Sequence, residues 1–308
     1  MDATNHNSKP PSRASQDRPS EARTVTVDGV RQVYRVAGQG PVCLVHPGGP
    51  GVHPDYLRLP SLEKHLTMVY LHPVGSGDSG LLSDGDYSMF RYGRFAEAVL
   101  DDVGATTAYF LGHSHGGFVA LQFGMNRPER LDGLILYDTA PLNGRELRET
   151  ATKEMAAFVE RWPDRPEAAE AGRVWDAVNV SQTFKVADDE SYQRYMNAIL
   201  PAYFADYRKT TQQVGQVGLR VTLDPNRLPV RWDARDRLGT INVPALVIVG
   251  TYDFICPPRF AYEMHAEMPN ARLCELRKSG HFGHLEESEQ FTAAVVEFVH
   301  TVEKDGRA

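Results

Sequence analysis

The chain has 308 residues, of which 42% are hydrophobic, and it carries a formal net charge of −7. This length suits one large α/β domain, or a core domain with one insertion. The negative charge and the lack of a Lys/Arg block argue against nucleic acid as a partner. No apolar run reaches the roughly 18 residues that a membrane-spanning helix needs, so we expect no membrane partner.

Residues 1–22 are rich in Pro, Ser, Asn and charged residues and lack an apolar segment. This composition predicts a disordered tail, not a secretory signal. The three cysteines, Cys43, Cys256 and Cys274, form no CxxC pattern. We therefore expect neither a disulfide framework nor a zinc knuckle, and a cytoplasmic protein is the simplest expectation.

Alternating residues over 24–38, interrupted at Asp28-Gly29, predict a β-hairpin. Continuous apolar runs then predict strands that are buried on both faces of a parallel sheet. These strands are expected within 41–48, 67–75, 108–114, 131–139, 244–253 and 271–280. Helical patterns lie between or after them, at 94–105, 116–130, 257–269 and 285–304. The alternation predicts an α/β fold, with helices on both faces of a mostly parallel sheet.

Residues 142–235 interrupt this alternation, since they show helical patterning and many aromatic residues but no convincing strand. We interpret them as a helical cap over the carboxyl edge of the sheet. Residues 23–141 and 236–308 then form the α/β core.

The segment Gly112-His113-Ser114-His115-Gly116 follows a predicted strand and precedes a predicted helix. This is the G-x-S-x-G pattern in the strand–turn–helix context of a nucleophile elbow. The helix dipole favours negative charge at such a turn. The pattern predicts Ser114 as the nucleophile, with the backbone N–H of His115 directed at a developing oxyanion.

A serine nucleophile needs a base, and the base needs an orienting acid. In this context the order along the chain is Ser, acid, His. Asp253 and His281 follow predicted strands in that order. Asp138 is the alternative acid, because it ends the preceding strand. His284 is the alternative base, but its place at the start of a helix favours a capping or packing role.

Glycines after the strand at 41–48 allow a close approach of the backbone to a substrate. We expect the N–H of Gly48 or Gly49 to complete an oxyanion hole with that of His115. Histidines gather in the motif loops, so a metal site is an alternative. His113-x-His115 begins an H-x-H-x-D-H pattern, but Gly-Gly-Phe follows and lacks the other ligands. The sequence thus predicts neither a metal nor a cofactor.

These motifs resemble the α/β-hydrolase superfamily, and within it the proline iminopeptidase-like branch. HPGGPG (46–51) resembles that branch's H-G-G-P-G oxyanion loop, and GSGDS (75–79) the end of its D-x-R-G-x-G-x-S element. SGHFGHLEE (279–287) resembles S-G-H-F-P-H-L-E-E, whose first His is catalytic. The resemblance covers about residues 24–300 and implies the roles given above for Ser114 and His281.

The chain departs from the branch at three places. Pro47 makes the glycine loop similar to the N-P-G-G-P-G loop of tripeptidyl aminopeptidases. The usual Asp and Arg are absent at His72-Pro-Val, and His115 follows the predicted nucleophile. Proline iminopeptidases share acidic residues in the cap that bind the free amine of the substrate. The candidates here are Glu146, Glu149, Glu154 and Glu160.

We therefore predict a serine hydrolase that cleaves an ester, lactone or amide bond of a small molecule or short peptide. A proline iminopeptidase-type aminopeptidase is the first alternative. The second is a hydrolase-fold receptor that binds a small molecule with little turnover. A dehalogenase is disfavoured, because its nucleophile is Asp.

Overall fold

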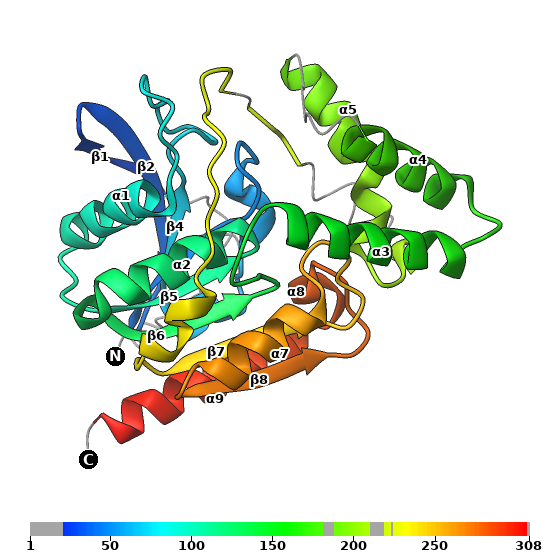
Figure 1. The fold of residues 1–308 in the computed structure, drawn as a ribbon. Coiled ribbons are helices and arrows are strands. Elements are labelled where there is room, and N and C mark those ends of the chain that lie inside the picture. The colour runs from blue at the N-terminus through cyan, green and yellow to red at the C-terminus, as the bar shows by residue number, and fades with distance from the viewer. Residues whose placement is uncertain (1–20, 181–187, 210–218, 223, 307–308) are drawn as a thin grey trace, which may run out of the picture.

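The computed structural model describes residues 21–180, 188–209, 219–222 and 224–306. Its centre is an eight-stranded sheet in the order β1-β2-β4-β3-β5-β6-β7-β8 (Figure 1). The strands are β1 (Ala22–Val27), β2 (Val30–Gly38), β3 (Val42–His46), β4 (Thr67–His72), β5 (Ala108–His113), β6 (Leu131–Tyr137), β7 (Ala245–Gly250) and β8 (Ala271–Leu276). The β1–β2 and β2–β4 pairs are antiparallel and all other pairs are parallel.

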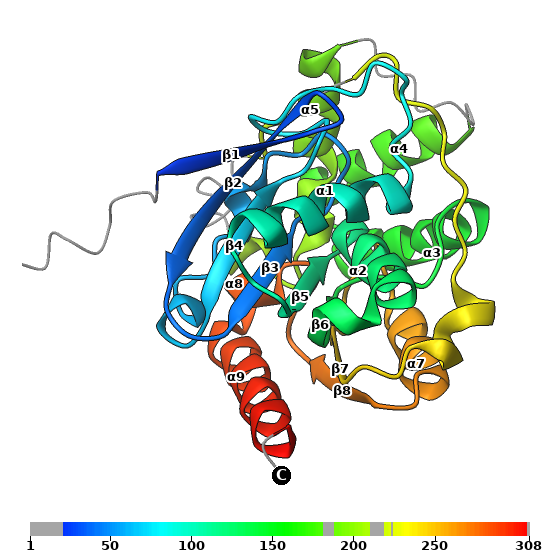
Figure 2. The same ribbon diagram turned by 90° about the vertical axis from the view of Figure 1, so that its left-hand side faces the viewer.

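Helices cover both faces of the sheet, as the ribbon shows from two sides (Figures 1 and 2). On one face, α1 (Met89–Asp102), α2 (His115–Asn126) and α7 (Pro258–Glu267) share a hydrophobic core with the strands. On the other, α9 (Ser288–Asp305) packs over a second core. All residues of β5 and β7 are consequently buried. This explains their continuous apolar runs, and it confirms the predicted fold class.

Two helices differ from the sequence-based expectation. The α1 helix begins at Met89, five residues before the predicted start at 94, because the side chain of Ser88 caps it by accepting the N–H of Arg91. The sequence predicts one helix over 285–304, whereas the structure has two helices there, α8 (Gly283–Glu286) and α9. They separate at Glu287, whose carboxylate turns back to accept the N–H of Lys278.

The region predicted as a cap contains α3 (Arg145–Arg161), α4 (Pro166–Val180) and α5 (Asp189–Ile199). Its aromatic residues largely form a core of their own, which also includes Phe254 and Phe282 from the loops after β7 and β8. The cap boundaries stay a prediction. Short 3-10 helices complete the described fold: η2 (Pro54–Leu57), η3 (Leu62–Lys64), η4 (Pro128–Arg130), η5 (Leu200–Tyr203) and η6 (Arg235–Thr240).

Most of the predicted tail, residues 1–20, lies outside the described residues, whereas β1 already begins at Ala22. None of the described helices is both long enough and apolar enough to cross a membrane.

Candidate active site

Ser114 occupies the turn between β5 and α2. Its backbone has φ 55° and ψ −122°, a left-handed conformation that is rare for a residue with a side chain. The turn is held on both sides, since the N–H of Ser114 donates to the carbonyl of Tyr137 (3.0 Å) and the hydroxyl of Thr139 donates to the carbonyl of Ser114 (2.7 Å). Strained backbone of this kind is concentrated at functional sites.

The glycines beside Ser114 are required by close backbone packing. A Cβ atom at Gly112 would lie 2.3 Å from the carbonyl oxygen of Gly116. One at Gly116 would lie 2.1 Å from the carbonyl oxygen of His46. The two glycines of the G-x-S-x-G pattern therefore allow β5, α2 and the end of β3 to meet.

His281 and Asp253 form a buried hydrogen-bonded pair at the ends of β8 and β7. The distance from His281 Nδ1 to Asp253 Oδ2 is 2.8 Å, and both side chains are at most 3% exposed. The other carboxylate oxygen, Oδ1, accepts the N–H groups of Ile255 (2.9 Å) and Cys256 (3.0 Å). The carboxylate is thus held on both oxygens, with Oδ2 directed at the imidazole.

Asp138, the alternative acid, is completely buried near this pair. Its Oδ1 accepts the N–H of Gly250 (2.7 Å), and its Oδ2 has no hydrogen-bond partner among the described residues. Burial, and secondarily the carboxylate of Asp253, raise the pKa of Asp138 well above its usual range. Asp138 is therefore expected to be protonated, and Asp253 is the acid that contacts His281.

His284, the alternative base, lies in another environment. Its Nδ1 is 3.0 Å from the hydroxyl of Tyr137, which also accepts the backbone N–H of His284 (2.9 Å). Its Nε2 is 3.2 Å from the carbonyl oxygen of Tyr56. These contacts give the ring a packing role between β6 and η2.

The two candidate oxyanion glycines differ in their contacts. The N–H of Gly48 donates to the hydroxyl of Tyr56 (2.6 Å). The N–H of Gly49 has no acceptor among the described residues. His115 is the first residue of α2, so its N–H is one of the four that a helix leaves unpaired. The geometry therefore favours Gly49 over Gly48 as the partner of His115.

Tyr56 and His113 connect the glycine loop to the loop that contains His281, a connection that the sequence alone did not reveal. Because the Tyr56 hydroxyl accepts from Gly48, it donates to Nδ1 of His113 (2.8 Å). His113 Nε2–H then donates to the carbonyl oxygen of His281 (2.9 Å). Burial lowers the pKa of His113 well below its usual value, which keeps the ring neutral, as this chain of hydrogen bonds requires.

The side chains of the elbow histidines diverge, since His113 lies against Tyr137 and His281, whereas His115 lies against Tyr92 and Phe118. The two rings therefore do not face a common position.

Ser114 and His281 open on the same small cavity, of about 50 Å³. Most of its other lining is apolar or aromatic, with contributions from the glycine loop, η2 and the predicted cap. The lining residues are Gly48, Gly49, Val52, Tyr56, His113, Ser114, Met196, Tyr203, Leu219, His281 and Phe282. A typical small-molecule pocket measures about 300–1,000 Å³. The side chains around Ser114 therefore leave little free space, while Ser114 itself stays partly exposed.

Replacing Gly48 with alanine is expected to lower kcat by about 100-fold for any reaction that uses the Ser114 hydroxyl. The new Cβ would lie 2.5 Å from Cβ and 3.0 Å from Oγ of Ser114, so the hydroxyl must move. Gly239→Ala is the control, because a Cβ there comes no closer than 3.7 Å to its surroundings. Steady-state kinetics of both variants test this. Equal kcat values would contradict the expectation.

Comparisons with known proteins agree with this fold. A family model described as alpha/beta hydrolase fold matches residues 41–288. The chain is 28% identical to a 2-hydroxymuconate semialdehyde hydrolase of Pseudomonas putida, over 93% of this chain and 96% of that protein. It is 24% identical to a proline iminopeptidase of Thermoplasma volcanium, over 89% and 95% respectively.

Among solved structures, an alpha/beta fold family hydrolase from Bacillus anthracis superposes with a TM-score of 0.70 at 20% identity, covering 91% of this chain and all of that one. The proline iminopeptidases among the relatives confirm the resemblance noted in the motifs. Because the family model spans most of the chain, including the elbow and the loops of Asp253 and His281, this protein belongs to the alpha/beta hydrolase fold family.

Proposed function

We propose that this protein is a serine hydrolase with Ser114 as nucleophile, His281 as base and Asp253 as orienting acid. The observation that carries the proposal is the buried 2.8 Å contact between His281 and Asp253, beside a serine in a strained elbow. His281 Nδ1–H donates to Asp253, so Nε2 is left with a lone pair that can take the proton of the Ser114 hydroxyl.

The reaction then follows from these positions. Ser114 Oγ attacks a carbonyl carbon, and the resulting oxyanion is held by the N–H groups of His115 and Gly49. The C–O or C–N bond of the substrate breaks as His281 returns the proton to the leaving group. Water, deprotonated by His281, attacks the acyl-enzyme and releases the acid together with free Ser114.

The lining of the cavity supports a small, apolar acyl group. Met196, Tyr203 and Leu219 place apolar or aromatic atoms around Ser114, together with Val52 and Phe282. A volume of about 50 Å³ is far below that of a typical small-molecule pocket. We therefore infer that short acyl esters or small lactones are the preferred class of substrate, and that larger ones require the cap side chains to move.

An aminopeptidase acting on substrates with a free amine is the second candidate, favoured by the proline iminopeptidases among the relatives. The four glutamates predicted as amine ligands are placed differently. Glu146 pairs with Arg235 (2.9 Å) and with Arg259, and Glu149, Glu154 and Glu160 are exposed. This arrangement supports a hydrolase of esters or lactones over an aminopeptidase.

A parallel screen of short-chain p-nitrophenyl esters, lactones and prolyl-naphthylamides tests the substrate class. We expect turnover of the esters or lactones, with kcat/KM falling as the acyl chain lengthens. Activity confined to substrates with a free amine would instead establish the aminopeptidase. Labelling of Ser114 by a fluorophosphonate without turnover of any acyl substrate would favour the small-molecule receptor.

Tyr56→Phe is expected to lower kcat by about tenfold, with KM little changed, because Gly48 N–H and His113 Nδ1 each lose a buried partner. Tyr70→Phe is a matched control. Its hydroxyl also accepts a backbone N–H, from Leu59 (3.0 Å), and donates to a side chain, Glu63 (3.0 Å), away from the cavity.

Both variants are expected to lose similar stability, about 1–3 kcal/mol. Only a positioning role for Tyr56 predicts a selective fall in kcat. Thermal unfolding and steady-state kinetics of the two proteins separate these effects, and an equal loss of kcat in both would show that Tyr56 is merely structural.

A further inference from the structure

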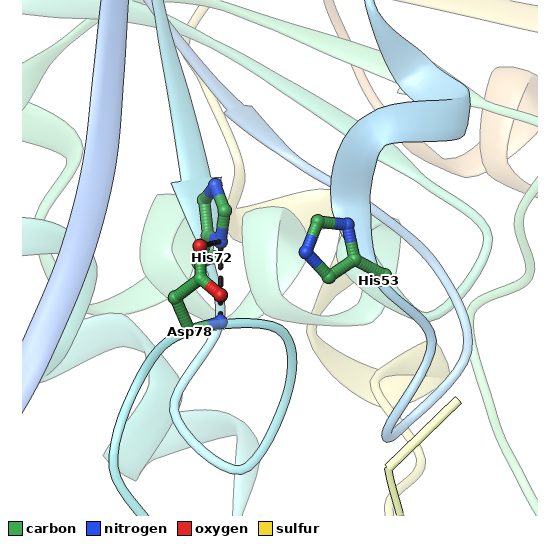
Figure 3. Close-up of side chains that lie close together, drawn as sticks. All are labelled: His53, His72 and Asp78. Atoms are coloured by element: carbon green, nitrogen blue, oxygen red, sulfur yellow. Dashed lines mark hydrogen bonds and ion pairs between the residues drawn. The ribbon is translucent and has the colours of Figure 1, made fainter. Parts of the chain in front are cut away.

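His53, His72 and Asp78 lie close together and come from two segments of the chain, with His72 buried and Asp78 exposed (Figure 3). His53 precedes η2, His72 ends β4, and Asp78 lies in the glycine-rich loop that follows. One ligand atom from each lies within 4.8 Å of the other two. We propose that these three side chains form a binding site for a divalent metal ion with a preference for nitrogen and oxygen ligands, of which Zn²⁺ is the best match.

The contact between His72 and Asp78 leaves two electron-rich atoms facing each other. The backbone N–H of Asp78 donates to Nδ1 of His72 over 3.3 Å, so this nitrogen is unprotonated and its single lone pair faces that N–H. A metal ion at Nδ1 has to replace this long hydrogen bond. The carboxylate Oδ2 of Asp78 lies 3.4 Å from the same Nδ1 (Figure 3). The N–H of Asp78 contacts only Nδ1, whereas a metal ion at this spacing would contact both acceptor atoms.

His53 supplies the third donor. Its Nδ1 lies 3.2 Å from Oδ2 of Asp55, a carboxylate that can accept Nδ1–H and so leave the lone pair on Nε2. Carboxylates commonly orient metal-binding histidines in this way. In Figure 3 the His53 ring lies across a narrow gap from the His72–Asp78 pair, and the two imidazole centroids are 5.2 Å apart.

A cationic group already occupies the His53 side of the gap. The guanidinium Nη2 of Arg220 is 3.0 Å from His53 Nε2 and 3.2 Å from Oδ2 of Asp55. The Arg220 side chain is 69% exposed, so it can leave this position at little cost. Since Nη2 is also 3.3 Å from His53 Nδ1, it lies beside the imidazole ring as a whole and places positive charge next to His53 without facing the Nε2 lone pair alone.

The spacing suits a tetrahedral ion. Two ligands about 2.0–2.1 Å from zinc in tetrahedral geometry are about 3.3–3.4 Å apart, close to the 3.4 Å between His72 Nδ1 and Asp78 Oδ2. His53 has to approach this pair by a modest side-chain movement. Three protein ligands leave the fourth position to water.

The backbone around the ligands is well anchored. The carbonyl of His72 accepts from Gln32 Nε2 (2.8 Å), the carbonyl of Asp78 accepts from Arg31 (2.6 Å), and the N–H of His53 donates to the carbonyl of Arg220 (2.7 Å). Bound metal would connect the 72–80 loop to the segment that follows Gly48 and Gly49. We therefore expect it to stabilise the loop that contains the candidate oxyanion glycines.

Titration of the chelator-treated full-length protein with Zn²⁺ in a calorimeter tests the proposal. We expect binding of one ion, weakened by about tenfold or more in D78N and in H53Q. R220A is expected to bind at least as tightly as wild type, because the competing guanidinium is gone. D84N is the matched control, since Asp84 is as exposed as Asp78, at 52%, and forms its ion pair with Arg91 (3.5 Å).

Co²⁺ absorption identifies the donor atoms independently of catalysis. Asp253, Cys256 and His281 also lie within 4.8 Å of one another, so a thiolate-to-cobalt charge-transfer band would place the ion there. The proposal would be overturned by that band or by an absence of Zn²⁺ binding. Weaker binding in R220A than in wild type, or equal affinity in D78N and D84N, would overturn it as well. Cobalt spectra with nitrogen and oxygen ligands only, lost in D78N, would support it.

Discussion

Ser114→Ala is expected to lower kcat by about 10⁴-fold or more on the best acyl ester, while the fold is retained. The alanine keeps the Cβ atom and adds no new contact to the turn, whose φ of 55° the surrounding hydrogen bonds already impose. Only the hydroxyl is lost, and with it the attack that forms the acyl-enzyme. The measurement is steady-state turnover of a short p-nitrophenyl ester, alongside mass spectrometry after fluorophosphonate treatment.

Ser88→Ala is a suitable control, because it removes a serine hydroxyl that caps α1 at a distance from the candidate site. It should cost about 1 kcal/mol of stability and leave kcat unchanged. A Ser114→Ala protein that kept more than about a tenth of wild-type activity would exclude Ser114 as the nucleophile. Loss of labelling in that variant, with labelling retained in Ser88→Ala, would identify the reactive hydroxyl.

The elbow and the buried His–Asp pair could be located from the sequence because parallel strands constrain them. Ser114, Asp253 and His281 each follow a continuous apolar run or a predicted strand. The carboxyl ends of parallel strands meet at one edge of a sheet, so residues far apart in sequence are brought together there. The catalytic roles of these residues stay a prediction that the variants test.

Other features depend on contacts that no local pattern encodes. The hydrogen bonds that link Gly48 to Tyr56, and Tyr56 to His113, form only because η2 folds over the end of β5. No sequence pattern distinguishes a tyrosine in such a segment. The break at Glu287 depends on its carboxylate, which accepts hydrogen bonds from the backbone N–H of Lys278 and the hydroxyl of Ser279, whereas the helical periodicity of the sequence continues through this residue. The periodic pattern of the sequence predicts where helices and strands lie, but their exact ends and contacts depend on tertiary hydrogen bonds.

The same reason explains why the sequence does not group His53, His72 and Asp78 into one site, although histidines gather in the motif loops. Their spacing matches no metal-binding pattern, and the glycine-rich loop around Asp78 suggests a turn. The pairing of β4 beside β3 brings the segment of His53 close to that of His72 and Asp78.

Asp253→Asn is expected to lower kcat by about 10⁴-fold, and Asp138→Asn by less than about tenfold. An asparagine at 253 can present its amide N–H to Nδ1 of His281, at the position where Oδ2 now lies 2.8 Å away. Nδ1 then has to accept, so the proton moves to Nε2 and the ring can no longer take the proton of Ser114. The geometry of the pair is preserved, and only the tautomer is wrong.

The change at Asp138 has no such consequence. Burial already raises the pKa of this carboxyl well above its usual range, so a neutral amide replaces a neutral acid. The amide oxygen can still accept the N–H of Gly250, which now donates to Oδ1 over 2.7 Å. The two variants, assayed side by side on one ester, therefore measure which carboxyl orients His281. A larger loss of kcat in Asp138→Asn than in Asp253→Asn would show that Asp138, at the end of β6, orients His281. The hydrogen bond between His281 and Asp253 would then be structural only.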